Sequence, residues 1–168
     1  DCNIINISTY EIPIEMFVYI FDSSFFLLKS NIKNSQMTFI SAIRSMIYIN
    51  DCSFINNTAQ NNPILFLNGN LLKNNLISLS YINNSIFVNN TALNDAGCIM
   101  ILNCLIQIKN NLFFNNTAFG KGGVIFFSGN MSNITLNLIQ NNFTQNFALS
   151  GGGIYYQKIT INIENNTF

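Results

Sequence analysis

Hydrophobic and polar residues alternate with a period of two in several short runs of the chain. The clearest runs are Ile47-Tyr48-Ile49, Ile106-Gln107-Ile108, Leu136-Asn137-Leu138 and Ile161-Asn162-Ile163. Successive side chains of a β-strand point to opposite faces, so this alternation is typical of strands that bury one face. The pattern therefore predicts an all-β fold built from short strands.

These runs belong to a longer repeat that is anchored by phenylalanine. Four stretches align without gaps: CSFINNTA (52–59), SIFVNNTA (85–92), NLFFNNTA (111–118) and NNFTQNFA (141–148). Their shared pattern is Phe-x-x-Asn-x-Ala. The same phase adds Ile4 and Phe25 as weaker anchors and Phe168 as the start of a further copy, so that successive anchors are 21 to 33 residues apart.

A unit of this length cannot bury the inner face of its two or three short strands alone. Stacking successive units in parallel buries that face, and such crossovers are normally right-handed. We therefore predict a right-handed parallel β-helix of about six coils in which residues 1–168 form a single segment; an antiparallel β-sandwich is the main alternative. Both chain ends fall at the same phase of the repeat. We accordingly expect a piece of a longer solenoid, or a unit that associates with its own copies end to end or laterally.

The repeated residues have distinct expected roles. One phenylalanine per coil should stack inside the solenoid: Phe25, Phe54, Phe87, Phe113 and Phe143. The asparagine three positions later should lie at a turn and bond to its counterparts in adjacent coils: Asn57, Asn90, Asn116 and Asn146. A glycine pair follows in AGCI (96–99), GGVI (122–125) and GGIY (152–155), where glycine permits positive φ and a close approach of two backbones.

The pairing of Phe-x-x-Asn with a Gly-Gly-hydrophobic-Ile element resembles the polymorphic outer-membrane protein repeat. More broadly, it resembles the pectin-lyase-like superfamily of right-handed parallel β-helices. The resemblance is clear over residues 50–168, and in residues 1–49 only the phase is kept; at 96–99 Ala96 replaces the first glycine. It implies a fold that serves in adhesion and in surface coats, and it does not imply a particular reaction.

The composition excludes several classes of function. Only 8% of the residues are charged and the formal net charge is zero, whereas nucleic-acid binding requires clustered Lys and Arg. No apolar run reaches the roughly 18 to 20 residues that span a bilayer, so we expect no transmembrane segment here. Polarity comes instead from 32 asparagines, which favour turns over helices.

The candidate catalytic and ligand-binding motifs are incomplete. The stretch AFGKGG (118–123) lacks the Ser/Thr and the following helix of a phosphate-binding loop, so Lys121 is expected to be incidental. Polysaccharide cleavage needs clustered carboxylates, often with calcium. Asp1, Asp22 and Asp51 share one phase and could stack, although they could equally cap turns. We therefore expect no catalytic, cofactor or metal site, and a polysaccharide lyase or hydrolase is the alternative.

The four cysteines match no zinc pattern, and the chain has no histidine to complete one. Cys98 and Cys104 could form a disulfide if a turn separates them. Otherwise the cysteines are expected to be small buried residues.

N-glycosylation is the strongest local signal. The chain has nine Asn-x-Ser/Thr acceptors: Asn6, Asn56, Asn83, Asn89, Asn115, Asn130, Asn133, Asn142 and Asn165. Turn formation alone could account for the Asn-Asn-Thr triplets, but exposed acceptors in a secreted protein are good substrates. The sequence thus predicts a non-catalytic, extracellular structural protein carrying N-linked glycans, in a coat, adhesin or filament. A module that binds carbohydrate through exposed residues such as Tyr48 and Tyr81 is a further alternative.

Overall fold

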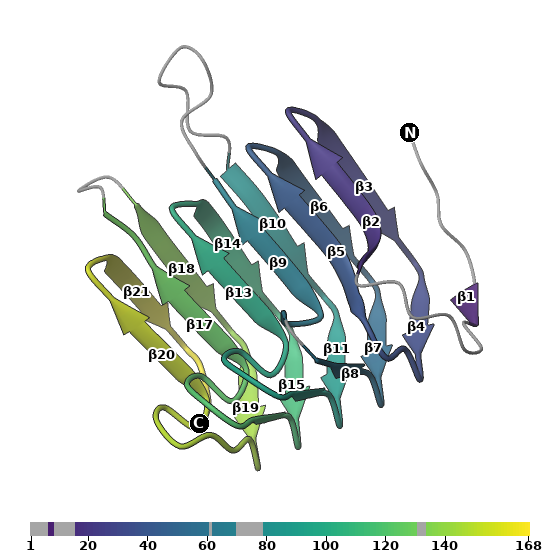
Figure 1. The fold of residues 1–168 in the computed structure, drawn as a ribbon. Coiled ribbons are helices and arrows are strands. Elements are labelled where there is room, and N and C mark those ends of the chain that lie inside the picture. Colours follow the sequence, from purple (N-terminus) through teal and green to yellow (C-terminus); the bar gives the residue numbers. More distant parts are fainter. Residues whose placement is uncertain (1–6, 9–15, 61, 70–78, 131–133) are drawn as a thin grey trace.

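A computed structural model describes residues 7–8, 16–60, 62–69, 79–130 and 134–168. Within these ranges the chain forms 21 β-strands, and none of its segments is a helix that could cross a membrane. The strands stack in parallel as a β-solenoid of about five turns (Figure 1). The predicted all-β parallel solenoid is confirmed, and the predicted number of coils, about six, is slightly too high.

Each of the five complete coils contributes one strand to each of three sheets, and a further strand from a partial coil at one end makes each sheet six strands deep. The first sheet contains β2 (Met16–Phe21), β5 (Thr38–Ile43), β9 (Leu65–Asn68), β13 (Ile99–Leu102), β17 (Ile125–Ser128) and β20 (Ile154–Gln157). The second sheet contains β3 (Ser24–Leu28), β6 (Met46–Asn50), β10 (Leu79–Asn83), β14 (Leu105–Lys109), β18 (Thr135–Ile139) and β21 (Thr160–Glu164). The third sheet contains β1 (Ile7–Ser8), β4 (Asn31–Lys33), β7 (Ser53–Ile55), β11 (Ile86–Val88), β15 (Leu112–Phe114) and β19 (Asn142–Thr144).

A short sheet follows the third sheet in the middle coils. It contains β8 (Thr58–Ala59), β12 (Thr91–Ala92) and β16 (Thr117–Ala118). We number the corners in chain order: the first corner joins the first and second sheets, and the second corner joins the second and third. The third corner leads from the third sheet into the short sheet, and the fourth corner returns to the first sheet.

A column of phenylalanines runs through the interior beneath the third sheet. Phe54, Phe87, Phe113 and Phe143 are buried. Their rings stack with centroids 4.7 Å, 5.0 Å and 4.8 Å apart, and Phe168 stacks on Phe143 at 5.0 Å. Each aromatic pair contributes about 0.5 to 1.5 kcal/mol beyond the area that it buries. The column therefore locks the register of successive coils.

Phe25 does not belong to this column. It lies in β3 of the second sheet and pairs with Ile47, whereas Ile32 is the residue of that coil that pairs with Phe54. The prediction was wrong because Asp22, which set the phase, occupies the first corner and not the second. Corners built on a left-handed polar residue look alike in sequence. The other weak anchor, Ile4, lies outside the described residues.

The glycine pair lies at the fourth corner. Its first residue has a positive φ of 63° at Ala96, 69° at Gly122 and 66° at Gly151. Its second residue passes close to the next coil, because a Cβ built on Gly123 would lie 1.9 Å from the carbonyl oxygen of Gly152. Both expected roles of the pair are confirmed. The last copy begins at Gly151, one residue earlier than the pattern predicts, because its connection is one residue shorter.

Candidate functional site: the corner asparagines

The second and third corners are each built from two residues with opposite orientations. The first residue is exposed and has a φ between 47° and 57°. The exposed residues are Lys29, Asp51, Asn84, Asn110, Gln140 and Asn165 at the second corner and Asn34, Asn56, Asn89, Asn115 and Gln145 at the third. The second residue is buried or half-buried: Ser30, Cys52, Ser85, Asn111, Asn141 and Asn166, and Ser35, Asn57, Asn90, Asn116 and Asn146.

Asparagine suits both positions of this corner. Its short side chain tolerates the left-handed region better than most residues do. Its amide also donates and accepts at once, which a buried position between two coils requires. The Asn-Asn pairs that occupy these two positions, at 56–57, 89–90, 110–111, 115–116 and 165–166, therefore have a structural explanation that is independent of glycosylation.

The inner residues of the third corner form a buried amide ladder. The Nδ2 of Asn57 donates to Oδ1 of Asn90 at 2.9 Å, that of Asn90 to Asn116 at 2.9 Å, and that of Asn116 to Asn146 at 3.0 Å. Each Oδ1 also accepts the backbone N–H of the preceding rung, beginning with Ser35 at 3.0 Å. The ladder thus binds side chains and backbone of adjacent coils together.

Sequence reasoning missed a second ladder, at the second corner. The Nδ2 of Asn111 donates to Oδ1 of Asn141, and that of Asn141 to Asn166, at 3.0 Å and 2.9 Å. Ser85 and Cys52 occupy the same position in earlier coils. The residue type changes along this column, so recurrence of one type could not reveal it. The signal available in the sequence was the pair of mostly polar residues directly before each segment that contains an anchor phenylalanine, such as Asn110-Asn111 before Phe113.

Three predicted glycan acceptors form an exposed row on the third corner. Asn56, Asn89 and Asn115 are all exposed. The Nδ2 of Asn89 donates to Oδ1 of Asn56 at 3.1 Å, and the Nδ2 of Asn115 to Oδ1 of Asn89 at 2.8 Å. The row places the nitrogen that would carry a glycan at the surface, and it also gives two of these nitrogens a partner within the protein.

The other predicted acceptors are distributed over the solenoid. Asn130, Asn142 and Asn165 are exposed, and the hydroxyl of Thr144 donates to Oδ1 of Asn142. Asn83 is half-buried at the end of β10, and its Oδ1 is a buried atom without a hydrogen-bond partner. Asn83 is therefore the least accessible of the described acceptors. Asn6 and Asn133 lie outside the described residues.

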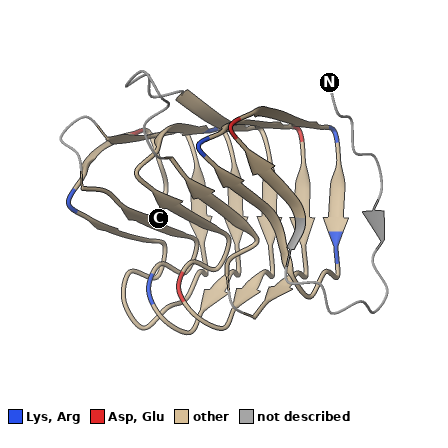
Figure 2. Ribbon diagram, turned by 45° about the horizontal axis from the view of Figure 1, so that its top comes forward, with Lys and Arg blue, Asp and Glu red and all other residues tan. Residues whose placement is uncertain are grey.

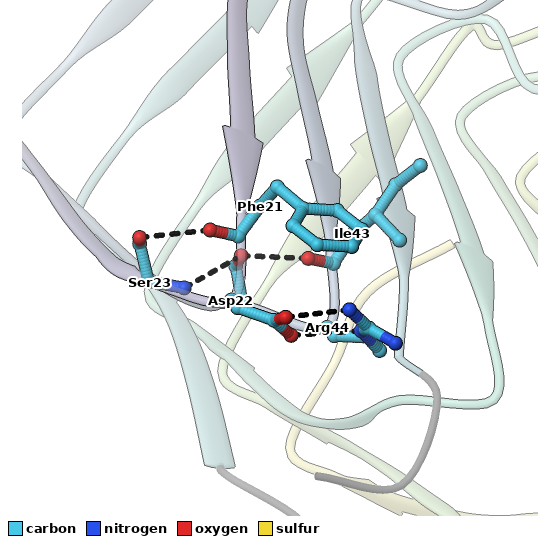
Figure 3. Close-up of polar contacts among 6 residues, drawn as sticks. Phe21, Asp22, Ser23, Ile43 and Arg44 are labelled. Atoms are coloured by element: carbon cyan, nitrogen blue, oxygen red, sulfur yellow. Dashed lines mark hydrogen bonds and ion pairs between the residues drawn. The ribbon is translucent and has the colours of Figure 1, made fainter. Parts of the chain in front are cut away.

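Asp22 and Asp51, two of the carboxylates expected to share one phase, do not stack. Asp22 lies at the first corner, where Arg44 of the next coil donates from Nε to its Oδ1 at 2.7 Å and forms a second bond from Nη2 (Figure 3). Asp51 lies at the second corner, where its coil neighbours are Lys29 and Asn84. Asp1 is outside the described part of the chain. The Asp22–Arg44 pair is half-exposed, so it contributes at most about 1 kcal/mol.

Charged residues lie mainly at strand ends and in the connections (Figure 2). In the described ranges no three His, Cys, Asp or Glu residues gather closely enough to hold a metal ion. Lys121 pairs with Ser150 of the next coil, and its Nζ lies 4.9 Å from the centre of the Tyr155 ring. The Lys121 side chain therefore contacts an aromatic ring of its own chain.

The described cysteines are free and buried. Cys98 precedes β13 and Cys104 follows it, and a four-residue strand spans about 13 Å, whereas a disulfide needs Cα atoms within about 7 Å. A bridge between these two residues is thus incompatible with the fold. Burial raises the pKa of the Cys104 thiol to about 12 and that of the Cys98 thiol well above its usual value.

These thiols predict a loss of stability in alkali. They stay protonated in the folded chain but ionise in the unfolded chain near pH 9, so ionisation above that pH favours unfolding. Between pH 9 and 10, each thiol should lower the free energy of unfolding by about 1 kcal/mol, because the unfolded thiol is already about half ionised at pH 9. Urea unfolding at several pH values measures the slope. Cys104→Ala should reduce it by one thiol's share, and an unchanged slope would contradict the assignment.

Aromatic side chains form a row on the outer face of the second sheet. The rings of Phe26 and Tyr48 lie 5.9 Å apart and those of Tyr48 and Tyr81 lie 6.0 Å apart, centre to centre. Gln107 and Asn137 continue the row in the following coils. The two tyrosines suggested by the sequence are therefore neighbours, although both are half-buried.

No protein-family model, curated protein or solved structure matches this chain. The resemblance to the polymorphic outer-membrane protein repeat therefore stays a prediction that rests on the Phe-x-x-Asn and Gly-Gly motifs.

Proposed function

We propose that this chain is the rod of an extracellular, N-glycosylated structural protein, in a surface coat, an adhesin or a filament, without a catalytic role. The observation that carries the proposal is the continuous register of the coils. The Phe54 and Asn57 columns run through successive turns with little change in spacing. The residues that recur in type along the chain join each coil to the next. This arrangement is expected of a rigid spacer and supports a structural role.

The exposed corners support the glycosylated form of this proposal. Asn56, Asn89 and Asn115 lie at exposed turns, where an attached glycan would extend into solvent. Adjacent strands are only about 4.8 Å apart, so glycans on neighbouring rungs would crowd one another. We therefore expect partial occupancy in this row and independent occupancy at exposed sites elsewhere, such as Asn142 and Asn165.

The proposal is tested on the protein in the cells that make it. Enzymatic release of N-glycans should lower its mass and convert each occupied acceptor to aspartate, which peptide mass spectrometry locates. Protease added to intact cells should also cleave the protein, since a surface rod is accessible from outside.

A matched variant separates glycosylation from folding. Asn56→Gly, Asn89→Gly and Asn115→Gly together remove the third-corner acceptors while keeping a residue that tolerates positive φ. This variant should lose only the glycans of that row. An unchanged mass after glycan release, together with full protection from external protease, would overturn the proposal.

A further inference from the structure

The connections that follow the short sheet carry an exposed apolar stripe. It consists of Leu93, Phe119, Phe147 and Leu149, which are 48%, 58%, 60% and 78% exposed. Hydrogen bonds join these connections from coil to coil: the Phe119 N–H donates to Ala92, and the Leu149 N–H donates to Gly120. The connections after β12, β16 and β19 accordingly lie side by side along one edge of the rod (Figure 1).

For the two inner residues of the stripe, Leu93 and Phe119, the exposure is not explained by a missing neighbour. Coils lie on both sides of Leu93 and on both sides of Phe119, yet about half of each residue remains exposed. By contrast, the equivalent position of the preceding coil is the polar Gln60. Large exposed apolar side chains in adjacent coils form a patch, whereas single ones are ordinary on protein surfaces.

We propose that two copies of this chain pair side by side through this stripe. The inference goes beyond the proposed function and does not depend on glycosylation. The four residues expose roughly 450 Å² per chain, taking about 190 Å² for each residue. Two copies would bury about 900 Å² from these side chains alone, close to the roughly 1,000 Å² expected of a specific interface. Neighbouring atoms would supply the remainder.

A second copy matches the stripe in both spacing and charge. A row of side chains repeated at the coil spacing of about 4.8 Å is complemented by another row with the same spacing, which an identical rod provides. The two charged side chains next to the stripe make contacts within their own chain. Oδ1 of Asp95 accepts a hydrogen bond from the backbone N–H of Lys121 at 2.7 Å, and Nζ of Lys121 lies over the Tyr155 ring. The formal net charge of zero leaves little repulsion between copies.

Sedimentation of the full 168-residue chain over a range of concentrations tests the pairing. The chain is produced in a bacterial cytosol without N-glycans, so the outcome is independent of the glycosylation proposal. We expect a monomer–dimer equilibrium that Leu93→Ser with Phe119→Ser weakens at least tenfold. The control Ile86→Ser removes a similarly exposed side chain from the outer face of β11 and should change the dissociation constant less than twofold.

Cross-linking supplies a second measurement if the double variant fails to fold. A symmetric pair brings the centre of the stripe against itself, so Phe119→Cys should form disulfide-linked dimers under mild oxidation, and Ile86→Cys should not. Cys2, which lies outside the described residues, is replaced by serine in both variants so that it cannot form the cross-link. A wild-type chain that stays monomeric, or equal cross-linking at both positions, would overturn the proposal. So would association that Phe168→Ser abolishes and the stripe variant leaves intact, because it would occur end to end.

Discussion

Replacing Gly123 with alanine is expected to lower the free energy of unfolding by roughly 3 kcal/mol, at the upper end of the usual cost of overpacking. The added Cβ would lie 1.9 Å from the carbonyl oxygen of Gly152 and 2.6 Å from that of Phe147. Both obstacles are backbone atoms, so no side-chain rotation relieves the clash. The coils must separate, which weakens the bond from the Ala118 N–H to the Phe147 carbonyl. Equilibrium denaturation measures the loss.

Gly153→Ala is the matched control for this prediction. The nearest atom to its added Cβ is 3.6 Å away, on the Phe168 ring. The structurally equivalent residues in earlier coils are Val124 and Cys98, so the position accepts a side chain. This variant should be neutral or slightly more stable, because alanine reduces the conformational freedom of the unfolded chain. Equal destabilisation by both variants would mean that glycine is needed for a reason other than close approach.

Replacing Asn90 with alanine is expected to cost about 4 kcal/mol, because it leaves several buried groups without partners. Its Oδ1 accepts from the backbone N–H and the Nδ2 of Asn57, at 3.1 Å and 2.9 Å. Its Nδ2 donates to the Phe54 carbonyl and to Oδ1 of Asn116, both at 2.9 Å. All of these groups lie away from water, so water cannot replace the lost bonds. Thermal and urea unfolding would both show the change.

The neighbouring residue provides the control. Asn89 takes part in the exposed row, and Asn89→Gly keeps a residue suited to its φ of 55°. Water can satisfy the amides that it leaves, so the expected change is below about 1 kcal/mol. If Asn89→Gly destabilised the protein as much as Asn90→Ala, the buried ladder would not be the main contribution of these corners to stability.

The fold could be predicted from the sequence because the same residue type occupies the same structural position in successive coils. Phe54, Phe87, Phe113 and Phe143 repeat in type and in phase, and a stacked column is the arrangement that uses such recurrence. The same holds for the inner asparagines of the third corner. Alternation of period two separated the buried face of each strand from the exposed one.

Features that depend on position and not on type could not be predicted. Asp22 and Asp51 look equivalent in sequence but lie at different corners, because each corner requires a left-handed residue and several polar residues can provide one. The second ladder changes from Ser and Cys to Asn along its length, which hides it from a search for repeated residues. Cys98 and Cys104 are near in sequence, yet a strand holds them apart.

The apolar stripe is another feature that residue type alone could not predict. Leu93 and Phe119 are ordinary hydrophobic residues within the repeat, and hydrophobicity alone would place them in the core. In the structure Ala92 and Ala118 face the interior, so the side chain that follows each of them points outward. Recurrence of residue type was enough to predict the parallel solenoid and its main columns, since stacking requires chemical repetition. Which corner each polar residue occupies, and which side chains of the connections lie together on the surface, depend on how each connection is routed between the sheets and so became visible only in the folded chain.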